Sequence, residues 1–415
     1  MLPWNTDLYL GFGKARPGEF NGSLFAKFQN ETLTAIYQPS EQGFIDMTPD
    51  YAESIIHFPG PDPTDPAQSG GSQWDWGNTY VYTPTVSSIT KHRNLPNVIH
   101  TWGEESTAEG LYAAVSSHQG DYKTWTGEVF RSDDLGDSWT RLANKDEGIG
   151  VYRTYDIIDF NNALYVIWND WLNGPCGISR STDGGYHWTR LSDFSYLTNC
   201  RSRLFVYNNQ LLALKVSQDG ILALNSSGVV TSHAFPGFQV QSWAYNPFAI
   251  DGQDRLYMVT EDDRIVRTTD LDTWQTLVAS DRDFITLSYW PDQDAIIAGD
   301  RGLAGRIWRL NPDASPVTQP PAPVPSMMVA GGDVVINWDP ATSLTYRIYR
   351  NSQPEFIGPV QYFHESANGN RWTDAGVAQE VGAIYYQVRS QNTPGDISDV
   401  TKTLGKFSFA IEPGM

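Results

Sequence analysis

A strand–turn–strand phrase recurs along the first three quarters of the chain, and it constrains the fold more than any other feature. Each copy is an apolar run, a turn rich in Asn, Asp or Gly, and a second apolar run. Four clear copies begin at Tyr155, Ser202, Tyr245 and Phe284, at intervals of 47, 43 and 39 residues. A period of this length is the signature of a repeat architecture, in which each unit packs on its neighbours.

Weaker copies of the phrase begin near Leu8, Ile55 and Val98, so six or seven units fill residues 1–310. Turn signals recur every few residues, and no stretch has the 3.6-residue periodicity of an amphipathic helix. The pattern therefore predicts an all-β fold. Its most probable form is a seven-bladed β-propeller, with six blades as the alternative.

The composition agrees with sheets that are covered on both faces. The chain has 15 Trp, 21 Tyr and 18 Phe, and only 18% of its residues are charged. The net charge of -20 repels phosphate backbones and anionic membranes. With no apolar segment long enough for a membrane span, neither a nucleic-acid partner nor membrane insertion is predicted.

The chain changes character after Leu310. Residues 311–325 are rich in proline and predict an extended, semi-rigid linker between two domains. Residues 326–415 contain short alternating strands, with Trp338 on an early one and Tyr385 and Tyr386 on a late one. This second domain resembles a fibronectin type III β-sandwich, and an unrelated small sandwich is the alternative.

Two strings in the first domain are nearly the same: "RSDDLGDSWTRL" at 131–142 and "RSTDGGYHWTRL" at 180–191. In such a string Asp can accept backbone hydrogen bonds in a tight hairpin, Gly allows positive φ, and Trp packs beneath the turn. A third, degenerate copy at 268–274 lacks the glycine and is one residue short. The predicted hairpin residues are Ser132, Asp134, Gly136 and Trp139; Ser181, Asp183, Gly185 and Trp188; and Asp270 and Trp274.

These strings resemble the Asp-box of sialidase-type propellers, although His187 stands where a hydroxyl residue is usual. The phrases "DLYLGFG", "WDWGNTYVY" and "VIHTWGEE" are also similar to a family of Asp-box propellers of bacteria and phages. The resemblance implies that the boxes lie on the outer strands and serve the fold. It brings no established activity, because function is not inherited with a fold.

Enzyme signatures are scarce. Sialidases carry an Arg-Ile-Pro motif, which neither Arg16 nor Arg153 has. Arg153, Arg201 and Arg203 open two successive repeats and are predicted to be surface or inter-blade residues. A lyase or hydrolase site remains the enzymatic alternative, built from His100 and His118 with Glu104 and Glu105.

No cofactor and no metal are predicted, since the seven histidines lack ligand spacing and a calcium loop in "GPDPTDP" at 60–66 is less favoured than simple turns. The two cysteines, Cys176 and Cys200, are predicted to be buried free thiols, with one disulfide bond as the alternative.

Tryptophans beside short polar residues are the strongest candidates for a binding site. Indole rings stack on the CH faces of sugars, and Asp and Asn bind the hydroxyl groups. Packing between blades is the alternative for at least half of these tryptophans. The candidate glycan-binding residues are Trp74, Asp75, Trp76, Trp168, Asp170, Trp171 and Trp243.

Three observations lead to a functional hypothesis: modules typical of extracellular proteins, an initiator Met without a leader, and an acidic surface. They predict a non-catalytic bacteriophage tail or virion surface protein, or otherwise an extracellular one, whose propeller binds a host-surface glycan or receptor. Other virion subunits and a second copy of the chain are expected partners. A glycan-degrading enzyme and a structural adaptor or decoration protein are the alternatives.

Overall fold

In the computed structural model the chain is all-β, as the sequence predicts. The described residues hold no α-helix, only strands and three short 3-10 turns at Ser192–Phe194, Pro291–Gln293 and Val377–Gln379. The structure describes residues 1–13, 24–30, 32–38, 43–44, 46–61, 76–118, 125–143, 148–149, 152–170, 176–194, 203–215, 217–241, 246–280, 282–300, 307–317, 320, 322–339, 344–352, 362–367, 369–379, 382–392, 398 and 404–406. Within them, no helix has the length and apolar character to cross a bilayer.

The first 310 residues form a series of antiparallel sheets, each made of consecutive strands. The first three sheets are β1 (Leu2–Trp4), β2 (Asp7–Phe12), β3 (Leu24–Gln29) and β4 (Thr32–Tyr37); β5 (Thr48–Asp50), β6 (Ile55–Gly60), β7 (Trp76–Thr83) and β8 (Ser88–Pro96); and β9 (Val98–Thr107), β10 (Gly110–Ser117), β11 (Thr126–Ser132) and β12 (Thr140–Ala143).

The next two sheets are β13 (Arg153–Asp159), β14 (Leu164–Asn169), β15 (Cys176–Ser181) and β16 (Thr189–Arg190); and β17 (Phe205–Tyr207), β18 (Gln210–Leu214), β19 (Gly220–Asn225) and β20 (Val230–Ala234). The last two are β21 (Phe248–Ile250), β22 (Leu256–Val259), β23 (Arg264–Thr268) and β24 (Gln275–Ala279); and β25 (Phe284–Trp290), β26 (Ala295–Asp300) and β27 (Ile307–Leu310). The predicted repeat starts at 155, 202, 245 and 284 fall at or near the first residues of β13, β17, β21 and β25.

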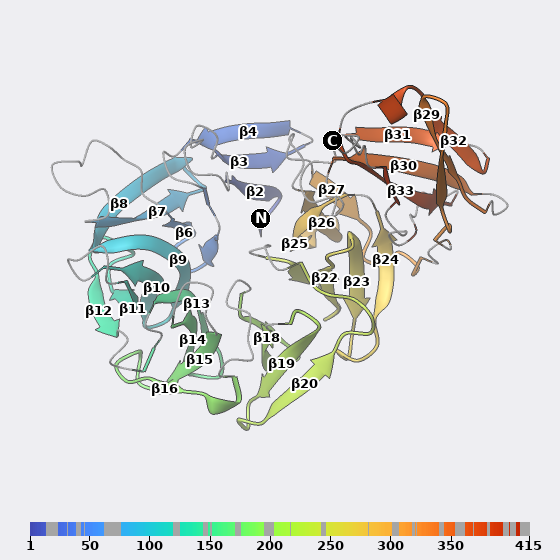
Figure 1. The fold of residues 1–415 in the computed structure, drawn as a ribbon. Helices are drawn as coiled ribbons and strands as arrows, with labels where there is room; N and C mark the ends of the chain where they lie inside the picture. Colours follow the sequence, from blue (N-terminus) through green and yellow to red (C-terminus); the bar gives the residue numbers. More distant parts are fainter. Residues whose placement is uncertain are drawn as a thin grey trace, which may run out of the picture.

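The sheets stand around a common middle, which gives a propeller-type fold (Figure 1). The fourth strands β8, β12, β16, β20 and β24 lie on the outside of the ring. Apolar clusters fill the spaces between successive sheets; Phe205 and Phe248, for example, stack 3.8 Å apart between the fifth and sixth sheets. Each such buried aromatic stabilises the ring by about 2 kcal/mol.

The ring closes by side-chain packing between its first and last sheets. Leu8 and Leu10 of β2 share a buried cluster with Trp290, Ala295 and Ile297 of the last sheet. The Trp290 indole also donates a hydrogen bond to the carbonyl of Asn5 over 3.4 Å. Because the first sheet consists of β1 to β4 alone, closure depends on this apolar contact and not on an exchanged strand.

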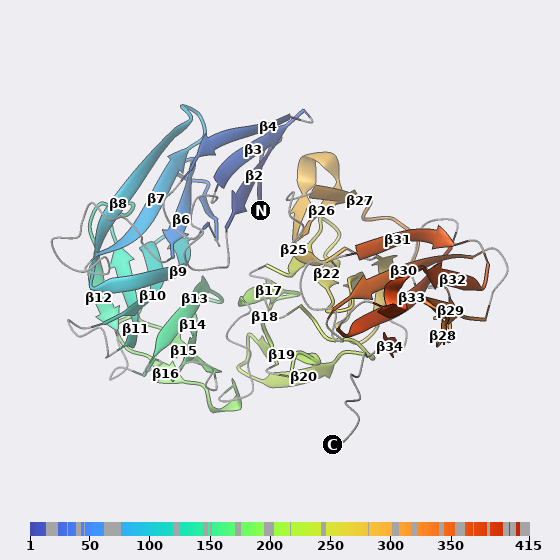
Figure 2. The same ribbon diagram turned by 45° about the horizontal axis from the view of Figure 1, so that its top comes forward.

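Residues after the ring form two packed sheets. One contains β28 (Ser326–Ala330), β29 (Asp333–Asn337) and β32 (Arg371–Asp374) in that order; the other contains β31 (Tyr362–Ala367), β30 (Thr345–Asn351), β33 (Ile384–Gln391) and β34 (Leu404–Lys406). Trp338, Tyr346 and Tyr386 are buried in the shared core. Both views place this C-terminal unit beside the last two sheets of the ring (Figures 1 and 2).

The first part of the proline-rich segment is anchored to the sixth sheet. The carbonyl of Pro312 accepts hydrogen bonds from the Tyr257 hydroxyl (3.2 Å) and the Arg267 guanidinium (2.7 Å). Asp313 pairs with Arg255 at 2.8 Å, and the Val317 N–H bonds the carbonyl of Thr276 on β24 at 2.9 Å. Residues 312–317 therefore follow the outer edge of this sheet and do not form a free spacer.

The prediction of two free thiols was wrong. Cys176 is disulfide-bonded, and the other cysteine of the chain is Cys200. The physical reason is the repeat geometry: Cys176 begins β15 inside the cluster that joins the fourth and fifth sheets, where the chain re-enters at Leu204. Closing a loop of this size stabilises a protein by about 3 kcal/mol.

Candidate functional site

The repeated strings form tight hairpins between the third and fourth strands of their sheets, and we call them the serine–aspartate hairpins (132–139, 181–188 and 268–274). In the first, the Ser132 hydroxyl donates to Asp134 Oδ1 and accepts the Gly136 N–H, both at 2.8 Å. Asp134 also accepts the Ser138 N–H at 2.8 Å and its hydroxyl at 2.6 Å. These bonds, led by the Ser138 hydroxyl, lower the pKa of Asp134.

The second hairpin repeats this network with a histidine. Asp183 accepts the His187 N–H at 2.9 Å, and the His187 Nδ1 lies 2.5 Å from Asp183 Oδ2, where the first hairpin has a serine hydroxyl. Partial desolvation raises the pKa of Asp183, but the His187 bonds outweigh it and bring the pKa to about 2. His187, which departs from the expected motif, therefore replaces the serine in the hydrogen bonding of the turn.

The degenerate third hairpin keeps the aspartate and loses the glycine. Asp270 Oδ1 accepts the Thr273 N–H at 2.7 Å, and Leu271 takes the left-handed conformation (φ 68°). In the fifth sheet, where no aspartate motif occurs, the Asn225 amide oxygen accepts two N–H groups of the same kind of turn. All these carboxylate and amide groups accept hydrogen bonds within their turns. The hairpins therefore stabilise the outer strands and offer no catalytic group.

The structure separates the predicted glycan-binding residues. Trp74, Asp75, Trp171 and Trp243 lie outside the described residues. Trp76 begins β7 in the second sheet with 46% of its surface exposed, as a platform for a ligand requires. Asp170 belongs to the fourth sheet and pairs with Arg190 at 3.5 Å.

Trp168 is a packing residue, which corrects the prediction made from its loop-like neighbours. Its side chain is 1% exposed, its indole donates to the Ser179 hydroxyl at 2.8 Å, and the Arg190 guanidinium covers the ring at 4.2 Å. Gly177 faces it across the β14–β15 pair, and a Cβ there would lie 2.5 Å from the indole. The fourth sheet accommodates the Trp168 indole in its interior, where no sugar can reach it.

An aromatic cluster around Arg153 lies between the third and fourth sheets. The Arg153 guanidinium carbon is 5.2 Å from the ring centre of Trp102, 5.0 Å from that of Trp125 and 4.9 Å from that of Tyr152. Trp125 and Tyr152 stack at 5.2 Å, with their planes 12° apart. We define the aromatic cluster as His100, Trp102, Trp125, Tyr152, Arg153 and Tyr155.

The sheet geometry brings these residues to one face of the ring. β9 and β13 are the first strands of neighbouring sheets, so their starting ends lie at the same face, and the start of β11 joins them because alternate antiparallel strands run the same way. The Trp102 indole is fixed by the Ser116 hydroxyl at 2.8 Å, and the Tyr155 hydroxyl accepts the Asn169 amide at 3.3 Å. His100 and Trp102 are buried, whereas Trp125, Tyr152 and Arg153 are half-buried at the rim.

Arg153 is electrostatically unusual. Among the described residues, no carboxylate lies within ion-pairing distance of its guanidinium, and its Nε is buried without a hydrogen-bond partner. Stacking on the aromatic faces, and not a salt bridge, orients the Arg153 guanidinium and its N–H groups. Such a site can accept an oxygen-rich ligand without first breaking an ion pair.

A second group, the central carboxylate cluster, consists of Asp46, Glu104, Glu105 and Asp156 with Arg203. The Arg203 guanidinium lies 2.5 Å from Asp46 Oδ1 and 3.8 Å from Asp156 Oδ1. Asp46 precedes the second sheet and Arg203 precedes the fifth, so this ion pair crosses the middle of the ring. Asp46 Oδ2 also accepts the Glu104 N–H at 3.4 Å, and Asp156 accepts the Leu204 N–H at 2.8 Å.

Burial shifts the pKa values in this cluster upward. Desolvation and the nearby Asp46 charge hold the pKa of Glu104 well above its usual range, and both of its oxygens are buried without a partner. Desolvation raises the pKa of Glu105 to about 8 against a hydrogen bond from the Asp159 N–H. Desolvation likewise raises the pKa of Asp156 to about 6, although Arg203 opposes it.

The predicted histidine–glutamate site is thus divided. Glu104 and Glu105 belong to the central carboxylate cluster, whereas His100 belongs to the aromatic cluster, 4.7 Å from Trp102. His118 is buried, and its backbone N–H donates a hydrogen bond to the Asn97 carbonyl at 3.1 Å. Of the three arginines predicted to be surface or inter-blade residues, Arg203 lies toward the middle of the ring and Arg201, like Arg16, lies outside the described residues.

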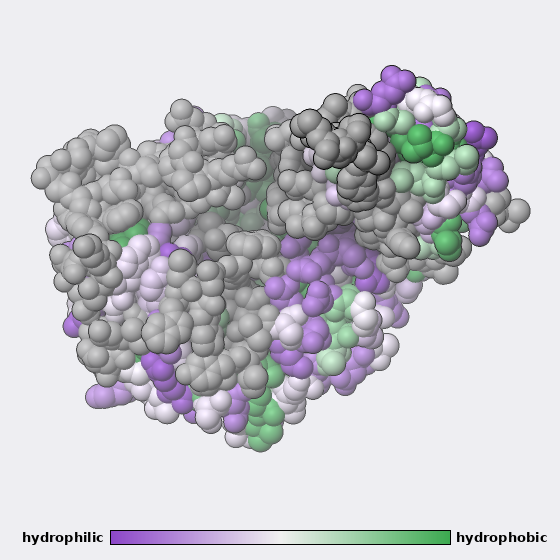
Figure 3. Space-filling model, in the orientation of Figure 1, coloured by the Kyte–Doolittle hydropathy of each residue, from purple (hydrophilic) through white to green (hydrophobic). Residues whose placement is uncertain are grey.

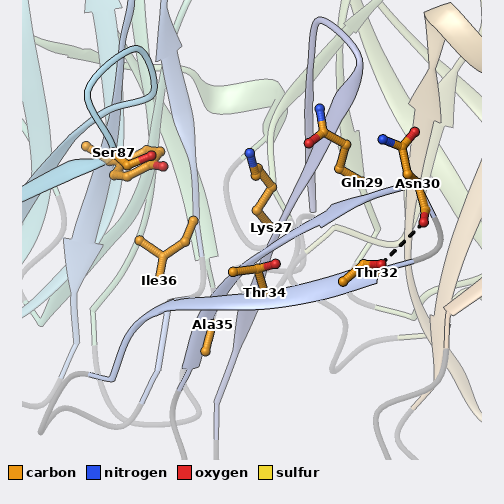
Figure 4. A pocket seen from close by; sticks show the side chains of 9 residues that line it. Lys27, Gln29, Asn30, Thr32, Thr34, Ala35, Ile36 and Ser87 are labelled. Carbon is orange, nitrogen blue, oxygen red and sulfur yellow. Dashed lines mark hydrogen bonds between the residues drawn. The ribbon is translucent and has the colours of Figure 1, made fainter.

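Two grooves of the described surface are lined by residues that belong to neither cluster. One, of about 520 Å³, follows β3 and β4 and is lined by Lys27, Gln29, Asn30, Thr32, Thr34, Ala35, Ile36, Tyr82 and Ser87 (Figure 4). Another, of about 580 Å³, lies between the second and third sheets and carries Asp50, Glu53, Glu109 and Asp133. Among the residues the structure describes, no cluster of His, Cys, Asp or Glu has a metal-binding arrangement. Residues 62–66 of the "GPDPTDP" segment, where simple turns were predicted in preference to a calcium loop, lie outside the described residues.

Comparison with known proteins supports the fold. No protein-family model and no curated protein matches the chain. One similar solved structure is the extracellular domain of a B. thetaiotaomicron protein described as a hybrid two-component system, with a TM-score of 0.53, 12% identity, and coverage of 96% of this chain and 55% of that one. A second such domain from B. thetaiotaomicron gives a TM-score of 0.51, 13% identity, and coverage of 96% and 53%. The chain therefore spans about half the length of these proteins, and the likeness shows the all-β, propeller-type fold alone.

Proposed function

We propose that the protein binds a glycan without turning it over, and that the sugar stacks on the aromatic cluster. The observation that carries the proposal is the Arg153 guanidinium, held among three aromatic rings at 4.9 to 5.2 Å with no described carboxylate partner. The CH face of a sugar ring can stack on the half-buried Trp125 and Tyr152. Its hydroxyl groups then accept the guanidinium N–H groups.

We also propose the finer architecture behind this site. The seven sheets are the blades of a seven-bladed propeller, and the C-terminal unit is of the fibronectin type III kind. The consecutive strand order of every sheet supports the first assignment. The three- and four-stranded sheets in the orders β28-β29-β32 and β31-β30-β33-β34 support the second.

The setting we propose is a phage virion surface, or otherwise an extracellular one, where the glycan belongs to a host cell. Its support is the disulfide bond at Cys176, because such bonds persist in oxidising surroundings. The phage assignment itself remains a prediction from the sequence.

A glycan array with the purified full chain, followed by titration of each hit, tests the proposal. We expect Trp125→Ala and Arg153→Lys each to weaken binding at least tenfold, which corresponds to about 1.4 kcal/mol. Tyr186→Ala is the matched control, because Tyr186 is 57% exposed in an outer hairpin. Absence of any hit, or hits that both variants leave unchanged, would refute the assignment.

A glycan-degrading enzyme is the second candidate, and the central carboxylate cluster favours it. Neighbouring carboxyl groups whose environments separate their pKa values are typical of acid–base pairs, and here Asp46 pairs with Arg203 while Glu105 has a pKa of about 8. Product analysis on every array hit distinguishes the two functions. Turnover that Glu105→Gln abolishes would establish the enzyme.

A further inference from the structure

We infer that β28, the edge strand of the C-terminal unit, is a docking surface for the same strand of a second copy of this chain. The two strands would pair antiparallel across a two-fold axis and join two three-stranded sheets into one. A second copy of the chain is an expected partner, and β28 would supply the surface and the two-fold symmetry for it.

Exposed apolar side chains concentrate at this edge. Val324, Met328 and Val329 are 73%, 52% and 56% exposed, and they are three of the ten exposed large apolar side chains of the described residues. The other seven are scattered over the ring. Apolar atoms are also visible on the outer part of the C-terminal unit (Figure 3).

Among the described residues, this edge lacks the protection that sheet edges usually carry. β28 pairs with β29 in an unbroken register from Ser326 to Ala330 and is the first strand in its sheet. Residues 324–332 contain no charged side chain, and the strand itself has neither a proline nor a bulge. By contrast, the outer strand β4 of the first sheet, which carries the exposed Leu33, has a register irregularity between Ala35 and Tyr37. An unprotected edge presents free backbone N–H and C=O groups, which favour strand addition.

Charge and symmetry favour a second copy as the occupant. Two chains of net charge -20 repel one another over most of their surfaces, so an uncharged strip is where they can approach. A two-fold axis at Met328 places Met327 opposite Val329 and Ser326 opposite Ala330, and all of these pairs are neutral. In Figure 2, β28 lies next to β29 at the lower side of the C-terminal unit.

The association should be weak and salt-dependent. A single pair of five-residue strands buries less than the roughly 1,600 Å² of a standard interface, so we expect dissociation constants in the micromolar range or above. Because salt screens the repulsion between the two acidic chains, dimerisation should strengthen as salt rises.

Sedimentation velocity of the full chain over about 1 to 300 μM, at low and high salt, tests the inference. We expect a concentration-dependent dimer, weakened at least tenfold by Val329→Lys and unchanged by Leu33→Lys, which places the same charge on another exposed edge strand. A chain that stays monomeric at the highest concentration and salt would overturn the inference. A dimer that Val329→Lys does not weaken would overturn it as well.

Cysteine cross-linking tests the symmetry with no need for a destabilising charge. At a two-fold axis the Met328 positions face each other at about 5 Å, within reach of a disulfide bond. Met328→Cys should therefore form a covalent dimer on mild oxidation, whereas Val229→Cys, at a site 54% exposed in the fifth sheet, should not. Equal cross-linking of the two variants would contradict the proposed pairing.

Discussion

The serine–aspartate hairpins and the central carboxylate cluster use the same kind of side chain in opposite ways. Asp183 lies at the outside of the ring, accepts several hydrogen bonds and has a pKa of about 2. Glu105 lies toward the middle, accepts one backbone N–H, and has a pKa of about 8. Both sets of carboxyl groups hold strands together, but one does so as an anion and the other as an acid.

The number of donors and the access of water decide between these states. A carboxylate that receives two or three N–H or O–H groups is stabilised as an anion, whereas burial without donors favours the neutral form. Arg203 pairs with Asp46, near the Met1 amino group, whose pKa is lowered by burial to about 6, so the guanidinium can balance Asp46 while Glu104 and Glu105 retain protons. The rim hairpins therefore depend on ionised carboxylates, whereas the middle of the ring combines the ion pairs of Arg203 with the protonated Glu104 and Glu105.

Removing the central cation should have the largest effect on stability. Arg203→Met leaves Asp46 and Asp156 buried without their positive partner, and breaking a buried ion pair costs about 3 to 5 kcal/mol. Urea unfolding at pH 7 measures the loss. Arg131→Met is the matched control at the rim, because its partner Asp133 is 75% exposed, and it should cost below about 1 kcal/mol. Equal losses in the free energy of unfolding for the two variants would contradict the proposed difference between the middle and the rim of the ring.

The pH dependence of stability should have opposite signs in the two regions. Glu105 and Asp156 have folded-state pKa values of about 8 and about 6, above their unfolded values. The stability that they contribute is complete below about pH 4 and is lost as the pH rises through 6 and then 8. Asp183 has a lowered pKa, so its contribution is present above about pH 4 and is lost as the pH falls through 2.

Two variants separate these limbs in urea unfolding between pH 2 and pH 9. Glu105→Gln should match the parent protein near pH 5 and exceed its stability by about 2 kcal/mol or more at pH 9, because it never acquires a charge at this half-buried, desolvated position. Asp183→Asn should lose stability at pH 7 by at most about 1 kcal/mol, since Asp183 is 41% exposed and screened by water. A parent protein whose stability rises from pH 6 to 9 would contradict the raised pKa values.

A glycine in each region tests what the backbone requires there. A Cβ at Gly103 would lie 2.9 Å from Asp156 Oδ1 and 3.2 Å from the Tyr155 carbonyl oxygen, so Gly103→Ala must displace the central carboxylate and should cost about 2 kcal/mol. A Cβ at Gly136 in the first hairpin would make only ordinary van der Waals contacts, the nearest at 3.7 Å, but its φ is 98°, so Gly136→Ala should cost about 1 kcal/mol through backbone strain. Thermal unfolding measures both. A central variant that melts no lower than the hairpin variant would reverse the expected order.

The sequence predicted the hairpins because their chemistry is local. Ser132, Asp134 and Ser138 lie within seven residues, and their spacing alone fixes which groups meet. The strand–turn–strand phrase likewise located β13, β17, β21 and β25, because one period of the repeat builds one sheet.

The clusters could not be predicted in this way, because their members come from different sheets. Asp46 and Arg203 meet across the ring, and no local pattern connects them. One signal was available in the sequence. Arg153 and Arg203 lie at equivalent places at the starts of consecutive repeats. A charged residue before the innermost strand of a sheet indicates a position near the middle of the ring. The prediction that Trp168 binds a ligand was wrong because it relied on the polar residues next to it in the sequence. The decisive residue is Gly177 on the paired strand, which has no side chain and so leaves room for the indole.

The smallest expected effect tests whether the second hairpin is a true equivalent of the first. His187 supplies through Nδ1 the contact to Asp183 that the Ser138 hydroxyl supplies to Asp134. His187→Ser should therefore unfold within about 0.3 kcal/mol of the parent, whereas His187→Ala removes one donor from an exposed carboxylate and should cost about 0.5 kcal/mol. Differential scanning calorimetry at pH 7 on the pair resolves the order. If alanine were tolerated as well as serine, the backbone N–H of residue 187 alone would hold the aspartate, and the side-chain contact would be dispensable to the rim.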